Sequence, residues 1–502
     1  MEKGFVALVG AGPGEIGLLT LKGKEYIEKA DVVVYDRLVS PEILDLIPTE
    51  AKKIDVGKDS GNHKVPQENI NSILLSEAQE GNIVVRLKGG DPFLFGRGAE
   101  ELELLIENNI PFEVVPGITS ALSVPSYAGI PVTHRDFCSS VHIITGHQKK
   151  NEALKINYEA LSQLGGTLVF LMGVANLKEI MEGLIEANMD KHTPAAVIEN
   201  GTCPNQRKVV GTIENLYERA DISQIKSPSI IVVGKVCELA GKYDWFTMRP
   251  LFGKKITVTR PKISGNTLSV KLRNLGAKVY DYPCIEIQEI INNETLKSEM
   301  GHISEYSWLV FTSKNGVQIF FDYLLKEKMD CRVLSNIKIA AIGSQTAQSL
   351  YDRGIIADFV PDVFDGEHLA NGLAEIIDKK DRVLLVRALM GTEEIPNILR
   401  ERGIFFIDVP IYKTLFKNEN SQHIESLIEH NEVDFITFTS ASTVEGFINS
   451  MPKVDLSKVT GICIGDKTAL RAKHYGIKHV ISEEATIDSM LAKILEVCNE
   501  GD

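Results

Sequence analysis

Polar and charged residues follow short apolar runs at several points in the first half of the chain, where α/β proteins place their ligands. The most suggestive stretch is 84–97, VVRLKGGDPFLFGR, which passes from an apolar strand into a Gly-Gly-Asp-Pro turn. Gly89 and Gly90 would let a bound molecule approach the backbone closely, and Asp91 can accept hydrogen bonds or face a cation. An isolated turn of this kind is also typical of a solvated loop. The motifs in the rest of the chain must therefore decide whether it is a ligand site.

Two other positions near strand ends carry groups that could do chemistry. Asp36 and Arg37 follow the apolar run VVVY, where a charged pair is either a capping device or part of a site. Lys58 lies in a glycine loop after a short strand, a place where a lysine is usually solvated. Position alone leaves both interpretations open.

The elements that would position these residues follow an α/β pattern. Strands alternate with helices to about residue 145, and strands come more often from there to 246, which predicts two α/β layers with a cleft between them. The first glycine loop reads Gly10-Ala11-Gly12-Pro13-Gly14-Glu15, which breaks the GxGxxG spacing and disfavours a dinucleotide fold. Residues 247–255, rich in Pro, Gly and basic side chains, predict a short junction before a second domain at 256–502.

The second domain contains an internal repeat. VFTSKNGVQIF at 310–320 recurs as TFTSASTVEGF at 437–447, and LRNLGAKVYDYPCI at 272–285 recurs as LRERGIFFIDVPIY at 399–412. The same spacing relates Arg260 to Arg387. The duplication predicts two similar α/β lobes with hydroxyl-bearing turns at their strand ends.

Composition excludes several classes of function. The formal net charge of −14 argues against non-specific nucleic-acid binding, which needs a basic surface. The seven cysteines are scattered without a CxxC pair, so neither a metal site nor a disulfide framework is predicted. The amino-terminal apolar run is too short for a signal peptide, and no window has the apolar length of a membrane span. We therefore expect a cytoplasmic protein with reduced thiols.

Residues 4–246 resemble the tetrapyrrole methylase family, and in particular uroporphyrinogen-III C-methyltransferase. The resemblance rests on motifs that occur in the family's order: VGAGPGEIGLLT, ADVVVYDRLVS, VGK, VRLKGGDPFLFGRGAEE, VVPGITSA, AGIPVTHR, TGH, LVFLMG and QRKVVGTI. It implies two subdomains, about 1–145 and 146–246, with S-adenosylmethionine bound in the cleft, and a homodimer.

The resemblance also implies roles for particular residues. Asp36 matches the proton acceptor and Lys58 the proton donor, although we expect Lys58 to hold a substrate carboxylate instead. Leu171 stands where the family often has Tyr. The positions that match cofactor contacts are Pro13, Gly89, Gly90, Asp91, Leu94, Thr119, Ser120, Met172 and Gly201. Because Arg pairs bidentately with carboxylates, we expect most substrate contacts from Arg37, Arg86, Arg97, His134 and Arg135, of which two would be ordinary surface ion pairs.

Residues 256–502 resemble uroporphyrinogen-III synthase through VTRP, FTSKNGV, AIGSQTA, GTEEIP, DVPIYKT, FTSASTV and IGDKTA. The family implies a swapped arrangement, with one lobe from about 256–290 plus 414–502 and the other from about 291–413. Tyr412 matches the side chain proposed to assist departure of the substrate's hydroxyl. The hydroxyls expected to bind carboxylates are Thr312, Ser313, Thr346, Thr439, Ser440, Ser442 and Thr468.

Together these resemblances predict an enzyme with two activities. The second half would cyclise hydroxymethylbilane to uroporphyrinogen III with inversion of the last ring, and the first half would methylate that product twice from S-adenosylmethionine to give precorrin-2, the precursor of sirohaem and cobalamin. The alternatives are a methylase with another substrate, either a tetrapyrrole or a protein, and a second half that senses a metabolite without catalysis.

Overall fold

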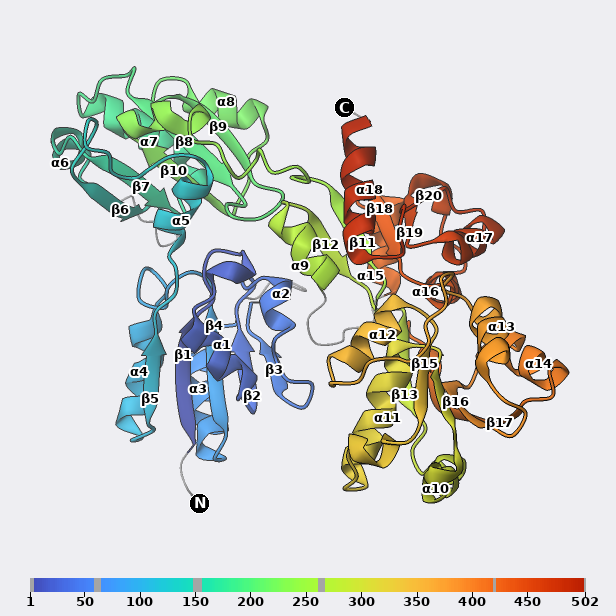
Figure 1. Cartoon of the computed structure of the whole chain (residues 1–502). Helices are drawn as coiled ribbons and strands as arrows, with labels where there is room; N and C mark the ends of the chain where they lie inside the picture. The colour runs from blue at the N-terminus through green and yellow to red at the C-terminus, as the bar shows by residue number, and fades with distance from the viewer. Residues whose placement is uncertain (1–3, 58–64, 148–155, 261–266, 419–420, 501–502) are drawn as a thin grey trace. The chain divides into compact units, whose positions relative to one another are not determined.

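The computed structural model describes residues 4–57, 65–147, 156–260, 267–418 and 421–500 (Figure 1). The chain forms two compact units: Met1–Lys254 with Leu272–Lys278, and Lys255–Lys271 with Val279–Asp502. The first is called the methylase unit and the second the synthase unit, after the resemblances above. Both are built from sheets covered by helices, so the predicted α/β fold class is confirmed.

The methylase unit begins with a parallel sheet in the order β3-β2-β4-β1-β5. Its strands are β1 (Phe5–Gly10), β2 (Val32–Tyr35), β3 (Lys52–Asp55), β4 (Ile83–Lys88) and β5 (Phe112–Val115). The three central strands are apolar, apart from Arg86 and Lys88 in β4, because helices cover both faces of the sheet. One face packs on α1 (Leu21–Glu28) and α2 (Pro41–Leu44), and the other on α3 (Gln67–Gln79) and α4 (Gly98–Glu107). The carboxyl ends of the strands are therefore left to loops.

The second sheet of this unit is mixed, in the order β6-β7-β10-β8-β9. Its strands are β6 (Val141–Thr145), β7 (Thr167–Leu171), β8 (Pro194–Glu199), β9 (Arg207–Thr212) and β10 (Ser229–Val233). Helices α7 (Leu177–Glu186) and α8 (Leu216–Ile222) pack on one face, and α5 (Ser120–Tyr127) packs on the other. Since α5 directly follows the last strand of the first sheet, its first turn lies where the two sheets meet.

The synthase unit contains two further sheets of similar design (Figure 1). One has the order β12-β11-β18-β19-β20, with β11 (Lys255–Val258), β12 (Lys278–Asp281), β18 (Phe435–Phe438), β19 (Thr460–Cys463) and β20 (His479–Ile481). The other has the order β13-β17-β16-β14-β15, with β13 (Ile285–Glu289), β14 (Trp308–Phe311), β15 (Lys338–Ala341), β16 (Arg382–Ala388) and β17 (Phe405–Phe416). The first sheet defines the end lobe and the second the middle lobe, which is the swapped connectivity expected from the family.

The lobe boundaries predicted from the sequence need correction. We placed 256–290 in the end lobe, but β13 pairs antiparallel with β17 of the middle lobe, from Ile285 opposite Phe416 to Glu289 opposite Tyr412. Its alternating apolar residues complete the edge of that sheet. The chain therefore crosses between lobes just before Ile285 and returns just after Phe416, where Lys417 N donates to Cys284 O at 3.0 Å.

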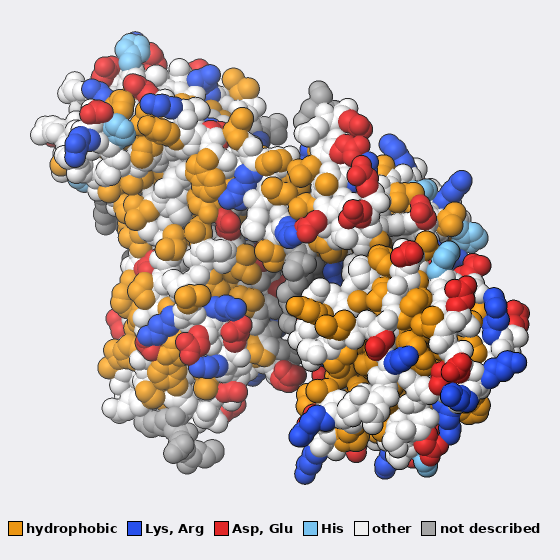
Figure 2. Space-filling model, viewed as in Figure 1, with side chains coloured by type: hydrophobic (Ala, Val, Ile, Leu, Met, Phe, Trp, Pro, Cys, Tyr) orange, Lys and Arg blue, Asp and Glu red, His pale blue; other side chains and the backbone are white. Residues whose placement is uncertain are grey.

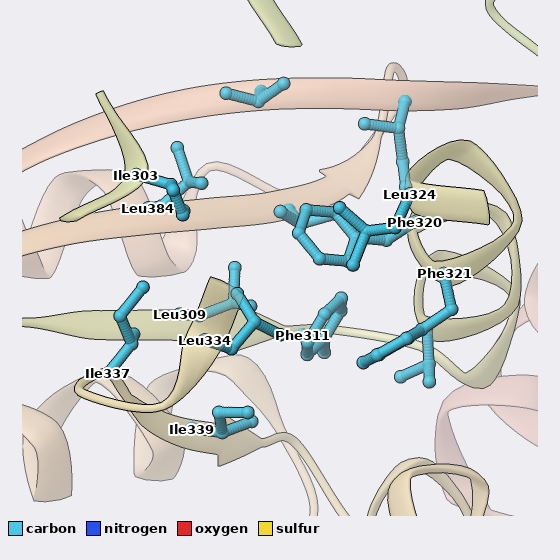
Figure 3. Close-up of a cluster of buried hydrophobic side chains, with 14 of the residues drawn as sticks. Ile303, Leu309, Phe311, Phe320, Phe321, Leu324, Leu334, Ile337, Ile339 and Leu384 are labelled. Atoms are coloured by element: carbon cyan, nitrogen blue, oxygen red, sulfur yellow. The ribbon is translucent and has the colours of Figure 1, made fainter. Parts of the chain in front are cut away.

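Aromatic packing fixes α11 (Lys314–Lys326) in the middle lobe. Phe311 at the end of β14 meets Phe320 of α11 edge to face, with ring centroids 5.4 Å apart, and Phe320 in turn meets Phe321 (Figure 3). Burying each such ring contributes roughly 1.5–3 kcal/mol. The first turn of α11 is thereby held beside the end of β14.

Positive and negative side chains are interspersed on the face that Figure 2 shows, without a broad basic area. No helix in the described part of the chain is long and apolar enough to cross a membrane.

Candidate active sites

Three glycine loops meet at the carboxyl ends of β1, β4 and β5. A Cβ atom on Gly117 would lie 2.1 Å from the carbonyl oxygen of Gly90, and one on Gly10 would lie 2.5 Å from the Cα of Gly117. Gly12 and Gly90 exchange backbone hydrogen bonds of 2.7 and 3.2 Å. Such close backbone contact excludes any larger residue at Gly10 or Gly117, so the glycine pattern reflects packing between loops.

Gly90 serves a second purpose in the same turn. Its φ of +69° lies in the left-handed region that favours glycine. A Cβ atom built on Gly90 would meet no described atom within 4 Å, so the space beside it is open. By contrast, a Cβ atom on Gly89 would lie 2.8 Å from the Cβ of Leu38. Of the two predicted contacts, Gly90 is the one whose surface faces free space.

Asp91 holds the turn together. Its Oδ1 accepts hydrogen bonds from the backbone of Phe93 at 2.9 Å and Leu94 at 3.1 Å, and its Oδ2 accepts one from Gly117 at 3.1 Å. The carboxylate thus joins the β4 turn to the loop after β5. The cofactor contact inferred for Asp91 stays a prediction, and the structure adds this role in shaping the loops.

Loops of the second sheet bring two of the predicted cofactor residues, Met172 and Gly201. Met172 follows β7 with a φ of +56° and is 49% exposed. Thr202, at φ +69°, accepts a 3.4 Å hydrogen bond from the backbone of Glu15 in the first glycine loop. A left-handed backbone at non-glycine residues is costly and concentrates at functional sites. The hydrogen bond between Glu15 and Thr202 joins the loops after β1 and β8, and Pro13 and Gly201 lie close to it in the sequence.

Thr119 and Ser120 begin α5 at the place where the chain crosses between the sheets. Thr119 is the N-cap residue, and its Oγ1 accepts from Ala121 N at 3.2 Å. Gly201 packs against the same helix, since a Cβ atom there would lie 2.2 Å from a methyl group of Val124. Leu94 is half-buried against this cluster. Thr119 thus caps α5, and the cofactor contacts inferred for Thr119 and for the half-buried Ser120 stay predictions.

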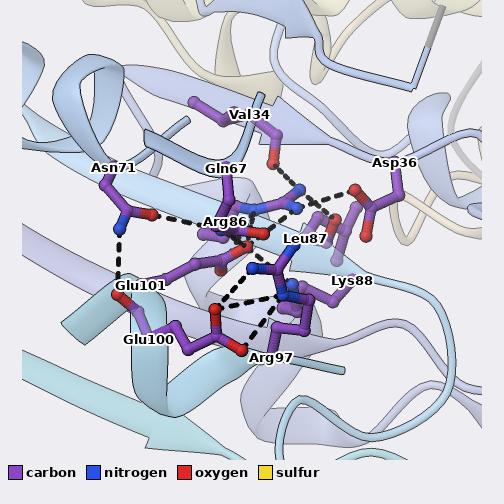
Figure 4. Close-up of polar contacts among 10 residues, drawn as sticks. All are labelled: Val34, Asp36, Gln67, Asn71, Arg86, Leu87, Lys88, Arg97, Glu100 and Glu101. Atoms are coloured by element: carbon purple, nitrogen blue, oxygen red, sulfur yellow. Dashed lines mark hydrogen bonds and ion pairs between the residues drawn. The ribbon is translucent and has the colours of Figure 1, made fainter. Parts of the chain in front are cut away.

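A buried ion network underlies Asp36 (Figure 4). Arg86, which is 1% exposed, donates from Nη2 to Asp36 Oδ1 at 2.7 Å and from Nε to both oxygens of Glu101 at 3.2 Å. Glu101 is fully buried and also accepts from Lys88 Nζ at 2.7 Å and from Gln67 Nε2 at 3.1 Å. Two cations and two carboxylates balance the charge, which a buried cluster requires.

This network corrects the role predicted for Arg86. Its guanidinium is enclosed and engaged by two carboxylates, so Arg86 orients Asp36 and does not reach out to a substrate. Asp36 itself keeps 31% of its side chain exposed, and in the described structure only Arg86 forms an ion pair with it. Burial lowers the pKa of Lys88, and the positive charge of Arg86 lowers it further. The charge of Glu101 and its hydrogen bond to Lys88 oppose this by raising the pKa.

Glu101 and Lys88 were not among the predicted site residues, although a signal for them exists. Arg86 and Lys88 are two residues apart in a strand and so point to the same face. Two cations on the same face of a buried strand call for a buried carboxylate on the covering helix. That helix, α4, carries Glu100, Glu101, Glu103 and Glu107, and only the packing selects Glu101.

Among the described residues, the other predicted cations are exposed, except for the half-buried His134. Arg97 forms an exposed ion pair with Glu100, with Nε to Oε1 at 3.0 Å. His134 Nδ1 lies 3.9 Å from a carboxylate oxygen of Asp136, and Arg37 and Arg135 are exposed. Lys58 lies outside the described residues. Arg97 is therefore one of the two surface ion pairs that we expected among the five candidate substrate contacts.

In the synthase unit the predicted hydroxyls gather at helix starts. Ser313 caps α11 by accepting from Gly316 N at 3.0 Å, and Ser440 caps α16 (Ala441–Ser450) by accepting from Thr443 N at 3.2 Å. Ser440 and Ser442 are 2.9 Å apart through their Oγ atoms. Thr346 and Thr468 are buried in the first turns of α12 (Ser344–Tyr351) and α17 (Asp466–His474), while Thr312 and Thr439 are half-buried.

Tyr412 joins this group from β17. Its Oη lies 2.8 Å from Ser313 Oγ, and the ring is 6% exposed. Burial raises the pKa of Tyr412, while the hydrogen bond with Ser313 opposes that rise. The hydroxyl is therefore protonated near neutral pH and is tied to the first turn of α11.

The two halves of the chain match two known protein families. The family of Tetrapyrrole (Corrin/Porphyrin) Methylases matches residues 6–217, and that of Uroporphyrinogen-III synthase HemD matches residues 266–492. The chain belongs to the enzymes that fuse a tetrapyrrole methylase domain with a uroporphyrinogen-III synthase domain, which act in porphyrin and siroheme biosynthesis.

Two relatives match the chain over nearly the whole length of both proteins. The Porphyrin biosynthesis protein HemD of Ruminiclostridium josui is 57% identical over 497 residues, 99% of each chain. The Uroporphyrinogen-III C-methyltransferase of Bacillus subtilis strain 168 is 34% identical over 492 residues, 96% of each chain. A solved uroporphyrin-III C-methyl transferase from Thermus thermophilus, complexed with S-adenyl homocysteine, is 36% identical and covers 47% of this chain and 99% of its own, with a TM-score of 0.41.

Proposed function

We propose that this chain converts hydroxymethylbilane to uroporphyrinogen III and then methylates that product twice to precorrin-2. The observation that carries the proposal is the presence of both domains on this chain. The Ruminiclostridium josui protein matches the chain almost from end to end. The product of one domain would be the substrate of the other. Both would take tetrapyrroles rich in carboxylates.

The methylase unit would bind S-adenosylmethionine over its glycine loops. The fit is supported by the open space beside Gly90 and by the left-handed backbone of Met172, two features that favour close approach of a ligand to the main chain. Pro13, Leu94, Thr119, Ser120 and Gly201 would line the same site. When bound, the cofactor supplies an electrophilic methyl group, so the protein need only align the partners.

Asp36 would act as the base. Attack of a pyrrole carbon on the methyl group leaves a cationic ring that must lose a proton. Arg86 binds Oδ1 of Asp36 at 2.7 Å, and no described residue donates to Oδ2, which is left to accept that proton. A base fixed at one oxygen by a buried guanidinium keeps its position through the reaction. Lys58, His134, Arg37 and Arg135 would contact substrate carboxylates.

The synthase unit would fold the linear substrate for ring closure. The terminal hydroxyl leaves as water, the ring carbon bonds to the freed methylene, and the ring then loses a proton. Tyr412 would donate its hydroxyl proton to the departing oxygen, with Ser313 holding the phenol at 2.8 Å. The capping hydroxyls and neighbouring amides at the helix starts would bind carboxylates.

Two further parts of the proposal rest on other grounds. The homodimer is inferred from the resemblance of the methylase unit to its family, and analytical ultracentrifugation tests it. Cytoplasmic localisation agrees with the seven cysteines, none of which forms a disulfide bond in the described structure.

One experiment tests both activities. The protein is incubated with hydroxymethylbilane and methyl-labelled S-adenosylmethionine, and the products are separated by isomer and mass. We expect the type III isomer carrying two labelled methyl groups. Type I product alone would favour a metabolite-sensing second half, and type III product without label would favour a different methylase substrate.

A further inference from the structure

Strand β17 contains one extra residue directly before Tyr412. The neighbouring strand β16 stays in unbroken parallel register with β17 as far as Arg387, which lies opposite Pro410. The next pair joins Ala388 to Tyr412, so Ile411 is left over between the two pairs. An extra residue of this kind is a β-bulge. Pro410 suits the place, because prolines inside sheets are confined to edges, strand starts and bulges.

The bulge decides which face of the sheet Tyr412 occupies. Successive side chains of a strand point to opposite faces, and Val409 and Ile411 belong to the apolar cluster around Phe311 (Figure 3). An unbroken strand would therefore turn Tyr412 to the other face. Instead Tyr412 belongs to the same cluster as Ile411, and its Oη lies 2.8 Å from Ser313 Oγ. Bulges beside active sites commonly re-aim a side chain in this way.

Asn293 holds the bulge from one side. It is the N-cap residue of α10 (Glu294–Gly301), where its Oδ1 accepts from Leu296 N at 3.0 Å. Its Nδ2 donates to Pro410 O at 2.7 Å. Asp and Ser cap helices as well as Asn does, so capping alone does not require the amide nitrogen. That nitrogen ties the start of α10 to the bulge.

Arg387 holds the bulge from the other side, through the loop that follows β16. The side chain is 7% exposed, and it donates from Nε to Asp408 Oδ1 and from Nη1 to Thr392 O, both at 2.8 Å. The loop between Arg387 and Thr392 pairs with the bulged strand, since Leu389 N donates to Tyr412 O at 2.8 Å. The backbone of Tyr412 is thus bound to a loop that a buried guanidinium holds in place.

We propose that Asn293 and Arg387 are positioning residues of the synthase reaction, because they hold the bulge at Pro410 that turns the Tyr412 hydroxyl toward Ser313. The inference rests on the proposed function of the synthase unit and deepens it. Neither side chain would touch the substrate, and each affects the phenol through the backbone of β17. A group that donates a proton depends on its placement, and a displacement of about 1 Å can cost about a hundredfold in rate.

The test uses two variants that keep most of the local structure. Asn293→Asp retains the oxygen that caps α10 and removes the donor to Pro410 O. Arg387→Lys retains the charge and removes the planar fork that bonds Asp408 and the loop together. The matched control is Asn157→Asp, which makes the first substitution at the N-cap of α6 (Tyr158–Gln163) in the methylase unit.

Cyclisation of hydroxymethylbilane is measured for each variant, alone and combined with Tyr412→Phe. We expect Asn293→Asp and Arg387→Lys each to lower kcat for the type III product about fivefold with KM within about twofold. Asn157→Asp should change neither constant. Once Tyr412 is Phe, the same two substitutions should lower kcat by less than about twofold, because residues that act through one group are not additive. A full fivefold loss in that background would overturn the proposal.

A second measurement follows the phenol itself. The protein is labelled with a fluorinated tyrosine, and the fluorine resonance of Tyr412 is identified by its absence from Tyr412→Phe. We expect Asn293→Asp and Arg387→Lys to shift this resonance and Asn157→Asp to leave it in place. A resonance that stays in place in the first two variants would refute the inference.

The outcomes separate this inference from the proposed function. If the unaltered protein does not cyclise hydroxymethylbilane, the synthase function fails, and the Tyr412 resonance then decides whether Asn293 and Arg387 position the phenol. If the unaltered protein cyclises the substrate and both variants keep its kcat, the two residues do not position Tyr412 for the reaction and the inference is refuted.

Discussion

Replacing Glu101 with Gln tests the buried network beneath Asp36. The substitution keeps the shape of the side chain but removes the charge that faces Arg86 Nε at 3.2 Å and Lys88 Nζ at 2.7 Å. Both cations are almost fully buried, and only Asp36 would remain to balance them. Removing one partner of a buried ion pair costs about 3–5 kcal/mol of unfolding free energy. We expect a loss of that size near pH 7.

The loss should depend on pH in a definite direction. Burial already lowers the pKa of Lys88 below its unfolded value, and loss of Glu101 would lower it further. The unfolded state then binds more protons than the folded state over the pH range between those two pKa values, so stability rises with pH across that range. The variant should therefore recover part of its stability as the pH approaches 10.

The matched control is Glu100→Gln at the adjacent position. Glu100 pairs with Arg97 on the surface, where an ion pair contributes about 0.5 kcal/mol or less. Unfolding by denaturant is followed through Trp245 of the methylase unit, with Trp308 of the synthase unit replaced by Phe in every sample. A loss below about 1 kcal/mol in Glu101→Gln, or a loss that does not shrink with rising pH, would refute the reasoning.

Three other predictions concern the proposed reactions. Asp36→Ala should abolish methyl transfer while S-adenosylmethionine binding, measured by calorimetry, stays within about threefold; lost binding would make Asp36 structural. Gly117→Ala should weaken S-adenosylmethionine binding at least about tenfold and lower stability, because its Cβ would lie 2.1 Å from Gly90 O. The control Gly301→Ala, whose Cβ would meet no atom within 4 Å, should change neither the binding nor the stability. Tyr412→Phe should slow type III ring closure by about tenfold or less in a stopped assay, and complete loss would show that the phenol is essential.

Local strand, turn and helix patterns were sufficient to predict the α/β fold, and the order of the motifs was sufficient, through the resemblance, to predict both domain families. The swapped lobes followed only from the resemblance, and the assignment of β13 was wrong because strand pairing joins Glu289 to Tyr412 across a large separation in sequence. The glycine loops were recognised as a site for a ligand. Their mutual contact, from Gly10 to Gly117, needed the three-dimensional structure.

The arginines show most clearly what tertiary structure decided. Arg86 and Arg387 lie near the ends of β4 and β16, and Arg260 lies just after β11. Arg97 instead directly precedes α4, and the sequence determined only that all four carry a positive charge. Packing made Arg86 and Arg387 buried partners of carboxylates and left Arg97 in an ion pair on the surface, whereas no residue in the described part of the chain forms an ion pair with the half-buried Arg260. The charge of an arginine is set by its chemistry alone, whereas its role depends on whether a carboxylate distant in sequence is folded against it.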